Sequence, residues 1–368
     1  MSNLNPPRRL LFGPGPSQVA PRVYEAMSKP IVGHLDPFFF EVYEDIRRDL
    51  RAVFGTQNSF VQVISGTGSA GMETSVANFV EPGQKLAVFV AGFFAERIVE
   101  MGKRHGAVVV RFDKPYGETA GEAEATEFLK RERPDVVAFV HAETSTGALQ
   151  NPLAITRPAH AIGALTIADC VTSLGALPIN TDASGIDVAF GCTQKGLSCP
   201  PGLSPVTVSP AAVERLRART APCSVWYMDL KLLLEYYEGA HRYHHTAPIS
   251  NFYALREGLA LVREEGVEAR FARHQTLHVE FVRRMEAAGF SMFIPDDCQR
   301  IATINTLHVP SGIDAAKVRK RLLDRHCIDI GGGFSSLAGK IFRVGLMGPL
   351  ATPENLDLLT GALVECIR

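Results

Sequence analysis

The chain has 368 residues, of which 46% are hydrophobic and 21% are charged, and its formal net charge is −1. This length suits one large α/β domain with a smaller second domain, and the charge balance gives no electrostatic argument for binding nucleic acid or an anionic membrane. No apolar run reaches the roughly 18 residues of a membrane span. We expect no secretory signal, and the odd number of cysteines without zinc or redox spacing predicts free thiols in the cytoplasm.

Two Gly-Pro pairs at residues 13–16 follow a polar start. Proline fixes φ and lacks an N–H group, so these pairs exclude a helix and predict an extended, kinked arm. The arm is either a rigid N-terminal segment or a piece of backbone that borders a substrate pocket. Residues 21–29 and 41–54 then predict two helices, because apolar residues recur in the second at helical spacing.

A glycine-rich turn at residues 65–71 follows a predicted strand at residues 60–64 and begins a helix. The turn matches the Gly-x-Gly-x-x-Gly pattern of dinucleotide-binding folds. The next strand, at residues 86–90, ends without the acid that binds a ribose hydroxyl in those folds. We therefore expect a site for a phosphate monoester, held by the helix N-terminus and the hydroxyls of Thr67 and Ser69. A merely tight strand-to-helix turn is the alternative.

Two further strand ends carry candidate residues. Phe93 and Phe94 follow the strand at residues 86–90, where a ring is either part of the core or able to stack on a planar ligand. A predicted strand at residues 136–140 runs into a hydroxyl-rich loop at residues 141–147. Since βα units recur from about residue 60 to 210, the sequence predicts a mainly parallel sheet with helices on both faces.

An acid and a lysine end the two strands that follow. The apolar stretch at residues 165–168 leads to Asp169, and a second one at residues 188–191 leads to Lys195. This pairing is typical of pyridoxal-phosphate enzymes, in which the acid keeps the pyridine nitrogen protonated and the lysine forms an imine with the aldehyde. The sequence therefore predicts Asp169 and Lys195 as the catalytic residues.

The C-terminal part predicts a second, smaller unit. Residues 228–237 are expected to be irregular, and long helices at residues 249–266 and 268–288 lead to strands at residues 291–295, 301–309 and 327–330 with a helix at residues 313–324. The histidines at residues 241–245 lack neighbouring acids or thiols, so we do not expect a metal site.

Arg343 lies inside an otherwise apolar strand at residues 341–345. A buried structural ion pair is one interpretation. A bidentate clamp for a substrate carboxylate is the other.

With these motifs the chain resembles the class V (fold type I) pyridoxal-phosphate aminotransferases, specifically the alanine–glyoxylate and serine–pyruvate group, from the Gly-Pro pairs to the strand of Arg343. The resemblance implies a large α/β domain at residues 21–265 with a mainly parallel seven-stranded sheet, a smaller α+β domain at residues 266–368, and an arm at residues 1–20.

The resemblance also implies a role for each site residue. In the family, the phosphate of pyridoxal 5'-phosphate is held at positions that match Thr67, Gly68, Ser69 and Gln194, and the ring lies between those that match Phe94 and Val171. The position of Thr144 lies near the ring oxygen. Asp169 matches the partner of the pyridine nitrogen, and Lys195 matches the lysine that binds the aldehyde. The substrate carboxylate falls to Arg343, with Gly15 and His34 beside it. Tyr243 and Thr246 reach the phosphate of a neighbouring subunit, which makes a homodimer with shared active sites.

The implied activity is the transfer of an amino group from alanine or serine to glyoxylate or pyruvate by a ping-pong mechanism. His34, Phe39 or Tyr243 would line the side-chain end of the pocket. A ureidoglycine–glyoxylate aminotransferase of purine breakdown is the main alternative, although that subgroup prefers Gln where this chain has His34 and Asn where it has Tyr243. A nicotinamide dehydrogenase built on the glycine-rich turn and a non-catalytic binding protein on the same fold are two others.

Overall fold

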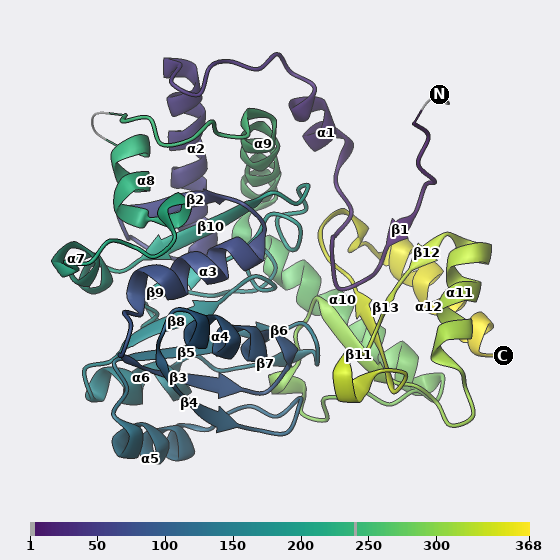
Figure 1. The fold of residues 1–368 in the computed structure, drawn as a ribbon. Helices are drawn as coiled ribbons and strands as arrows, with labels where there is room; N and C mark the ends of the chain where they lie inside the picture. Colours follow the sequence, from purple (N-terminus) through teal and green to yellow (C-terminus); the bar gives the residue numbers. More distant parts are fainter. Residues whose placement is uncertain (1–3, 239–240) are drawn as a thin grey trace.

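A computed structural model describes residues 4–238 and 241–368, and its central feature is a seven-stranded sheet in the order β2-β10-β9-β8-β5-β3-β4 (Figure 1). Its strands are β2 (Phe60–Ser65), β3 (Lys85–Val90), β4 (Val108–Asp113), β5 (Val136–Val140), β8 (Leu165–Asp169), β9 (Val188–Phe190) and β10 (Leu203–Val208). Only β10 runs antiparallel to its neighbours among these strands. The predicted mainly parallel seven-stranded sheet is therefore confirmed.

The middle strands are mostly apolar because helices cover both faces of the sheet. Every residue of β5 and β8 is buried, as is usual for strands inside a parallel sheet. The connecting helices are α3 (Gly68–Phe79), α4 (Phe93–Arg104), α5 (Glu122–Glu132), α6 (Leu153–Ala161) and α7 (Pro210–Ala218). A short hairpin of β6 (Ala142–Glu143) and β7 (Ala148–Leu149) follows β5.

Two helices differ from the sequence prediction because their capping signals decide the boundary. Helix α2 (Pro37–Phe54) starts four residues before the predicted position, since the Asp36 carboxylate accepts the Phe38 N–H at 2.9 Å and Pro37 suits the first turn. The stretch predicted to be irregular contains η1 (Trp226–Met228) and α8 (Leu230–Tyr237), so that prediction was wrong. Helix α8 is capped by Asp229 and buries Leu230, Leu233, Tyr236 and Tyr237.

The N-terminal helix α1 (Pro21–Met27) and the long helix α9 (Ile249–Glu265) complete the large unit, and α10 (Val267–Ala287) leads out of it after Gly266, whose φ is 86°. The C-terminal unit contains a three-stranded sheet, β11-β14-β13, and two helices. These elements are β11 (Ile304–His308), β13 (Gly331–Gly332), β14 (Ile341–Gly345), α11 (Ala315–His326) and α12 (Pro353–Ile367), with short turns η2 (Asp297–Gln299), η3 (Ser335–Leu337) and η4 (Gly348–Leu350). The strand predicted at residues 291–295 is only an isolated bridge between Met292 and Leu307.

The N-terminal arm packs on the C-terminal unit. Strand β1 (Leu10–Leu11) pairs in parallel with β12 (Ile328–Asp329), and Phe12 is fully buried in the second of two large hydrophobic clusters. The first cluster extends from Val19 to Val262. These clusters support the division that we propose, with an arm at residues 1–20 (residues 1–3 lie outside the described part), a large domain at 21–265 and a small one at 266–368.

Two kinds of feature are absent from residues 4–238 and 241–368. No helix there combines the length and the apolar character needed to cross a membrane. No group of three or more His, Cys, Asp or Glu side chains is arranged there to hold a metal ion.

Candidate active site

A cavity of about 300 Å³ lies at the carboxyl ends of β2, β8 and β9. It brings together side chains from the arm, the glycine-rich turn, helix α4 and three later strand ends. The sequence-predicted residues that line it are Gly15, Thr67, Gly68, Ser69, Phe94, Thr144, Asp169, Val171, Gln194 and Lys195.

The glycine-rich turn presents free hydrogen-bonding groups to this cavity. Thr67 is the N-cap of α3, yet its side chain makes no capping bond, and Ala70 is the first helix residue whose N–H bonds back, to the Thr67 carbonyl at 2.7 Å. The N–H groups of Gly68 and Ser69 precede that bond and remain available at the positive end of the helix. A Cβ on Gly68 would lie 2.7 Å from Val171 Cγ2, so the turn requires glycine there. These features fit an anionic group such as a phosphate.

Gln194 contributes a second unsatisfied group. Its side-chain Oε1 is buried and, among the described residues, has no hydrogen-bond partner. Buried polar atoms are normally paired, so this orphan indicates a ligand. Backbone hydrogen bonds hold both the glycine-rich turn and the Gln194 segment in place. The Gly66 N–H bonds to the Gly202 carbonyl at 2.8 Å, and the Thr193 N–H bonds to the Leu203 carbonyl at 3.2 Å.

Asp169 ends β8 and its side chain is buried at 3% exposure. One carboxylate oxygen accepts the Val171 N–H at 2.9 Å. Burial raises the pKa of this carboxyl to about 7, and the Val171 hydrogen bond only partly opposes that shift. A carboxylate in such a place is stabilised by a cationic or N–H donor partner.

Lys195 follows β9 and points toward the N-terminal arm. Its Nζ donates to the Pro14 carbonyl, and a Cβ on Gly15 would lie 2.7 Å from Nζ. Burial lowers the pKa of the Lys195 ammonium, although the Cys192 thiol and Asp169 act in the opposite direction. The arm is fixed here, since Ser17 donates through its N–H to the Gln194 carbonyl at 2.9 Å and through its hydroxyl to the Lys195 carbonyl at 2.7 Å.

Phe94 is oriented by a buried acid. The Phe94 N–H donates to the Glu143 carboxylate at 3.2 Å, and Glu143 also accepts the N–H and the hydroxyl of Ser145. Burial raises the pKa of Glu143. On the other side, the guanidinium of Arg97 lies 5.1 Å from the centroid of the Phe94 ring. The ring is therefore held at the cavity wall rather than in the core.

A second cavity of about 340 Å³ adjoins the first through Gly15, Phe94, Thr144 and Lys195. Arg343 lines it at 4% exposure. The Arg343 Nε donates to the Gly332 carbonyl at 2.7 Å and Nη1 to the Thr144 carbonyl at 3.1 Å, while the guanidinium lies 4.1 Å from the Phe334 ring centroid.

No carboxylate in the described part of the chain lies within 4.0 Å of the Arg343 guanidinium. The predicted alternative of a buried structural ion pair is therefore not found there. Burial lowers the pKa of Arg343 to about 10. An anionic ligand would supply the missing partner.

Three predicted residues lie elsewhere on the chain. Tyr243 is 61% exposed, Thr246 is exposed, and the Tyr243 ring centroid lies 5.0 Å from that of His34. None of the three lines either cavity. Phe39 is fully buried against Tyr43 and other aromatic rings, so the hypothesis that it lines a substrate pocket was wrong.

Several cavity residues were not predicted. They include Met72, Arg97, Pro201, Arg319 and Phe334. Arg97 had a signal, since it follows Phe94 by three residues in a helix and therefore lies on the same face. Arg319 and Phe334 had none, because they belong to the C-terminal unit and reach the cavity only through the tertiary fold.

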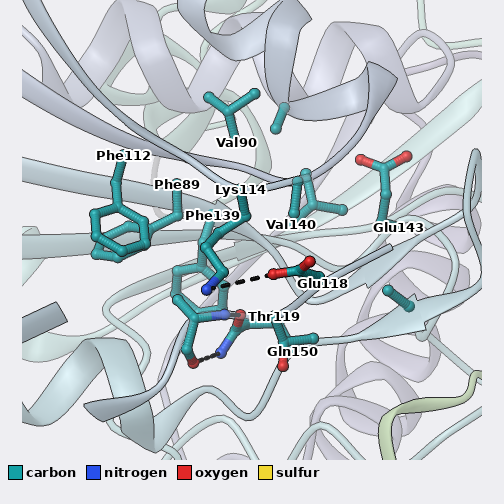
Figure 2. Close-up of a pocket in the computed structure, with 14 residues that line it drawn as sticks. Phe89, Val90, Phe112, Lys114, Glu118, Thr119, Phe139, Val140, Glu143 and Gln150 are labelled. Carbon is teal, nitrogen blue, oxygen red and sulfur yellow. Dashed lines mark hydrogen bonds and ion pairs between the residues drawn. The ribbon is translucent and has the colours of Figure 1, made fainter. Parts of the chain in front are cut away.

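A third cavity lies behind Glu143 and is shown in Figure 2. It measures about 20 Å³, which is room for about one water molecule. Lys114 Nζ lies 3.6 Å from the Glu118 carboxylate (Figure 2), and the Gln150 amide bonds to the backbone N–H and carbonyl of Ala120. This space is too small for a substrate, so the candidate site remains the pair of cavities at Lys195.

Comparison with known proteins gives a consistent result. The family model described as Aminotransferase class-V matches residues 9–359. An alanine–glyoxylate aminotransferase of Callithrix jacchus is 36% identical over 368 residues, covering 99% of this chain and 89% of that protein. The (S)-ureidoglycine–glyoxylate transaminase of Bacillus subtilis is 34% identical, covering 98% and 91%. The crystal structure of an alanine–glyoxylate aminotransferase from Nostoc sp. is 44% identical with a TM-score of 0.98, covering 100% and 97%.

Proposed function

Because the chain belongs to the aminotransferase class-V family of fold type I enzymes, we propose that it moves the amino group of alanine or serine to glyoxylate or pyruvate with pyridoxal 5'-phosphate as cofactor. One observation supports this proposal most. A buried acid, a lysine and an anion-binding turn line one cavity, and an arginine without a carboxylate partner lines the next.

The residues around the first cavity fit the proposed cofactor. Its phosphate would lie at Thr67, Gly68, Ser69 and Gln194, its ring between Phe94 and Val171, its ring oxygen near Thr144 and its ring nitrogen at Asp169. When bound, this cofactor withdraws electrons from the substrate Cα and stores the amino group between the two half-reactions.

Asp169 and Lys195 would do distinct work. The Asp169 carboxylate is buried and makes no ion pair within 4.0 Å in the described chain, so a protonated ring nitrogen would keep it ionised. Lys195 has a pKa lowered by burial, which increases the share of free amine at neutral pH. That amine can take the proton from the substrate Cα as a general base and return it as an acid.

Arg343 would bind the carboxylate of the substrate. Two carbonyls, those of Gly332 and Thr144, fix the plane of its guanidinium. The remaining N–H groups are free to make charge-assisted hydrogen bonds to a carboxylate. The substrate Cα is then directed toward Lys195, which lines the same cavity.

We further propose a homodimer in which each subunit completes the other's site. Tyr243 and Thr246 are exposed on their own chain and line neither of its cavities, and His34 packs beside Tyr243. Mixing two inactive variants, Lys195→Ala and Thr246→Glu (which would place a negative charge beside the cofactor phosphate), should restore activity, because one of the two sites in a mixed dimer receives only wild-type residues. Failure of the mixture to recover activity in subunits shown to exchange would contradict shared sites.

The cytoplasm is the proposed location. All seven cysteines are free, which agrees with a reducing compartment.

A ureidoglycine–glyoxylate aminotransferase is the second candidate. The relative with that name in Bacillus subtilis is nearly as similar as the mammalian enzymes. His34 and Tyr243 depart from the residues that this subgroup prefers, and their contact in the structure suggests that they act together. We therefore favour alanine or serine as the amino donor.

A half-reaction spectrum separates these candidates. The yellow protein loaded with pyridoxal phosphate should bleach on addition of alanine or serine without an oxo acid, and glyoxylate should restore the colour. Full bleaching by ureidoglycine with weak bleaching by alanine would favour the second candidate. A protein that stays colourless with added pyridoxal phosphate would contradict both.

A further inference from the structure

We propose that the cavity at Arg343 also accepts amino acids and oxo acids that carry a second carboxylate, and that Arg319 binds this second group. The inference rests on the proposed aminotransferase function and deepens it, because alanine, serine, glyoxylate and pyruvate each carry a single carboxylate.

Arg319 lies on α11 and lines the same cavity as Arg343 and Lys195. Its Nε donates to the Ile330 carbonyl at 3.0 Å, which anchors the side chain at its base. Its Nη1 lies 3.1 Å from the position of a Cβ on Gly332, and the carbonyl of this same glycine accepts the Arg343 Nε. The two guanidinium groups therefore flank a single residue of β13.

The wall between the two arginines consists of glycine. Side chains are excluded from it, since a Cβ on Gly331 would lie 2.6 Å from Pro14 Cδ and a Cβ on Gly333 would lie 2.0 Å from the Leu337 carbonyl oxygen. Gly331, Gly332 and Gly333 all line the cavity of about 340 Å³. The space beside Arg343 is therefore open, and nothing on this wall covers Arg319.

The charges of the cavity favour an anion with two negative groups. Within residues 4–238 and 241–368, no carboxylate lies within 4.0 Å of either guanidinium. Asp329 is the only acid among the described residues lining the cavity, which also holds Arg319, Arg343 and Lys195. A substrate with one carboxylate pairs with Arg343 and leaves Arg319 without a partner. A substrate with two carboxylates would pair one with Arg343 and the other with Arg319.

Arg319 is exposed at the mouth of the cavity, so a general attraction of anions has to be separated from a specific contact. Arg325 provides a matched control. It lies on the same helix, its side chain is 63% exposed, and it lines neither cavity. Arg319→Gln and Arg325→Gln remove the same charge from the protein, but only the first removes it from the cavity.

The experiment uses the enzyme loaded with pyridoxal phosphate and compares half-reaction rates with aspartate, glutamate, alanine and serine. We expect the wild type to react with at least one of the two dicarboxylic donors. Arg319→Gln should lower the ratio of kcat/KM for that donor to kcat/KM for alanine by about tenfold or more, as expected for the loss of a charge-assisted contact. Arg325→Gln should leave the ratio unchanged.

A binding measurement checks the same contact without turnover. Succinate has two carboxylates and propionate has one, and neither has an amino or oxo group to react. Calorimetry should show tighter binding of succinate to the wild type, and this preference should disappear in Arg319→Gln but persist in Arg325→Gln.

The outcomes separate the inference from the proposed function. Reaction with alanine or serine but not with aspartate or glutamate would overturn the inference alone, as would equal effects of the two glutamine variants. Reaction with aspartate or glutamate but not with alanine or serine would overturn the proposed donors and support the role of Arg319.

Discussion

Two regions of the molecule carry the predicted site residues, and they differ in how complete they are. Around Lys195, residues from the arm, the glycine-rich turn and several strand ends meet in one cavity of a single chain. Around Tyr243, the predicted residues lie on the surface and line no cavity at the proposed site.

The difference follows from what holds each region. The Lys195 cavity is built on the large hydrophobic cluster, and its residues are placed by strands that are buried along their length. Tyr243 is 61% exposed and Trp226, whose ring stacks on the neighbouring His244, is 60% exposed. Large exposed aromatic side chains that lie close together mark surfaces that another molecule covers. The first region is therefore assembled within one chain, whereas the second fits the subunit interface that we propose.

The largest effect is expected at the centre of the Lys195 region. Lys195→Ala should lower transamination by at least about 10⁴-fold, because no other lysine among the described residues lines the cavity to replace Nζ as base and nucleophile. Single-turnover bleaching with alanine measures this loss. Circular dichroism and gel filtration should show an intact fold and an unchanged assembly, and substantial turnover in the variant would refute the role of Lys195.

A smaller effect in the same region concerns the stability of the protein without cofactor. Burial raises the pKa of Asp169 from an ordinary value of 3.8 to about 7. A raised pKa means that the folded state favours the protonated acid, so its contribution to stability is present below about pH 4 and is lost as the pH rises to 7. Asp169→Asn should therefore raise the free energy of unfolding at pH 8, by up to about 4 kcal/mol, and change it little at pH 4.

Asp187 supplies the control for this prediction. It is also buried, but its carboxylate accepts hydrogen bonds from the Thr166 N–H at 2.9 Å and the Ser209 hydroxyl at 2.9 Å. Asp187→Asn should lower stability at pH 8, the opposite sign. Denaturant unfolding of the protein without cofactor, at both pH values, measures the two differences. Destabilisation of both variants at pH 8 would show that Asp169 has a partner within its own chain.

The smallest effect is expected in the exposed region. Tyr243→Phe should change the free energy of unfolding by less than about 0.5 kcal/mol, because the side chain is mostly in solvent. The affinity of the Tyr243→Phe variant for pyridoxal phosphate should fall by about three- to tenfold, as expected for the loss of one hydrogen bond. Equilibrium dialysis measures this affinity, and Tyr24→Phe, at 53% exposure on α1, is the control. A loss of stability with unchanged cofactor affinity would place the role of Tyr243 within its own chain.

Most of the predicted residues at Lys195 line one cavity, and the sequence could group them because their signals are local. Asp169 ends one apolar strand and Lys195 closely follows another, and strands of one direction in a parallel sheet have their carboxyl ends at a common edge. The glycine-rich turn likewise carries its own signal. Helix α8 was missed although Asp229 and the buried leucines after it gave a capping and spacing pattern.

Other features had no local signal. Strand β1 pairs with β12 across almost the whole chain, and no periodicity in Leu10–Leu11 indicates that partner. Arg319 is one of many charged residues on α11, and only the packing of that helix beside β13 brings it to the cavity. In the homodimer that we propose, the positions of Tyr243 and Thr246 relative to a cofactor would depend on a second chain, which one sequence does not describe.

The reversed strand β10 has a geometric consequence. It lies between β2, which leads to the glycine-rich turn, and β9, which leads to Lys195. Two adjacent carbonyls at its start, those of Gly202 and Leu203, hold the backbone of both segments. Neighbouring strands are about 4.8 Å apart, so the turn and the lysine segment are set two such steps apart. The spacing of the strands thus sets the distance between the two segments, and a molecule anchored at the turn has to span that distance to react at Lys195.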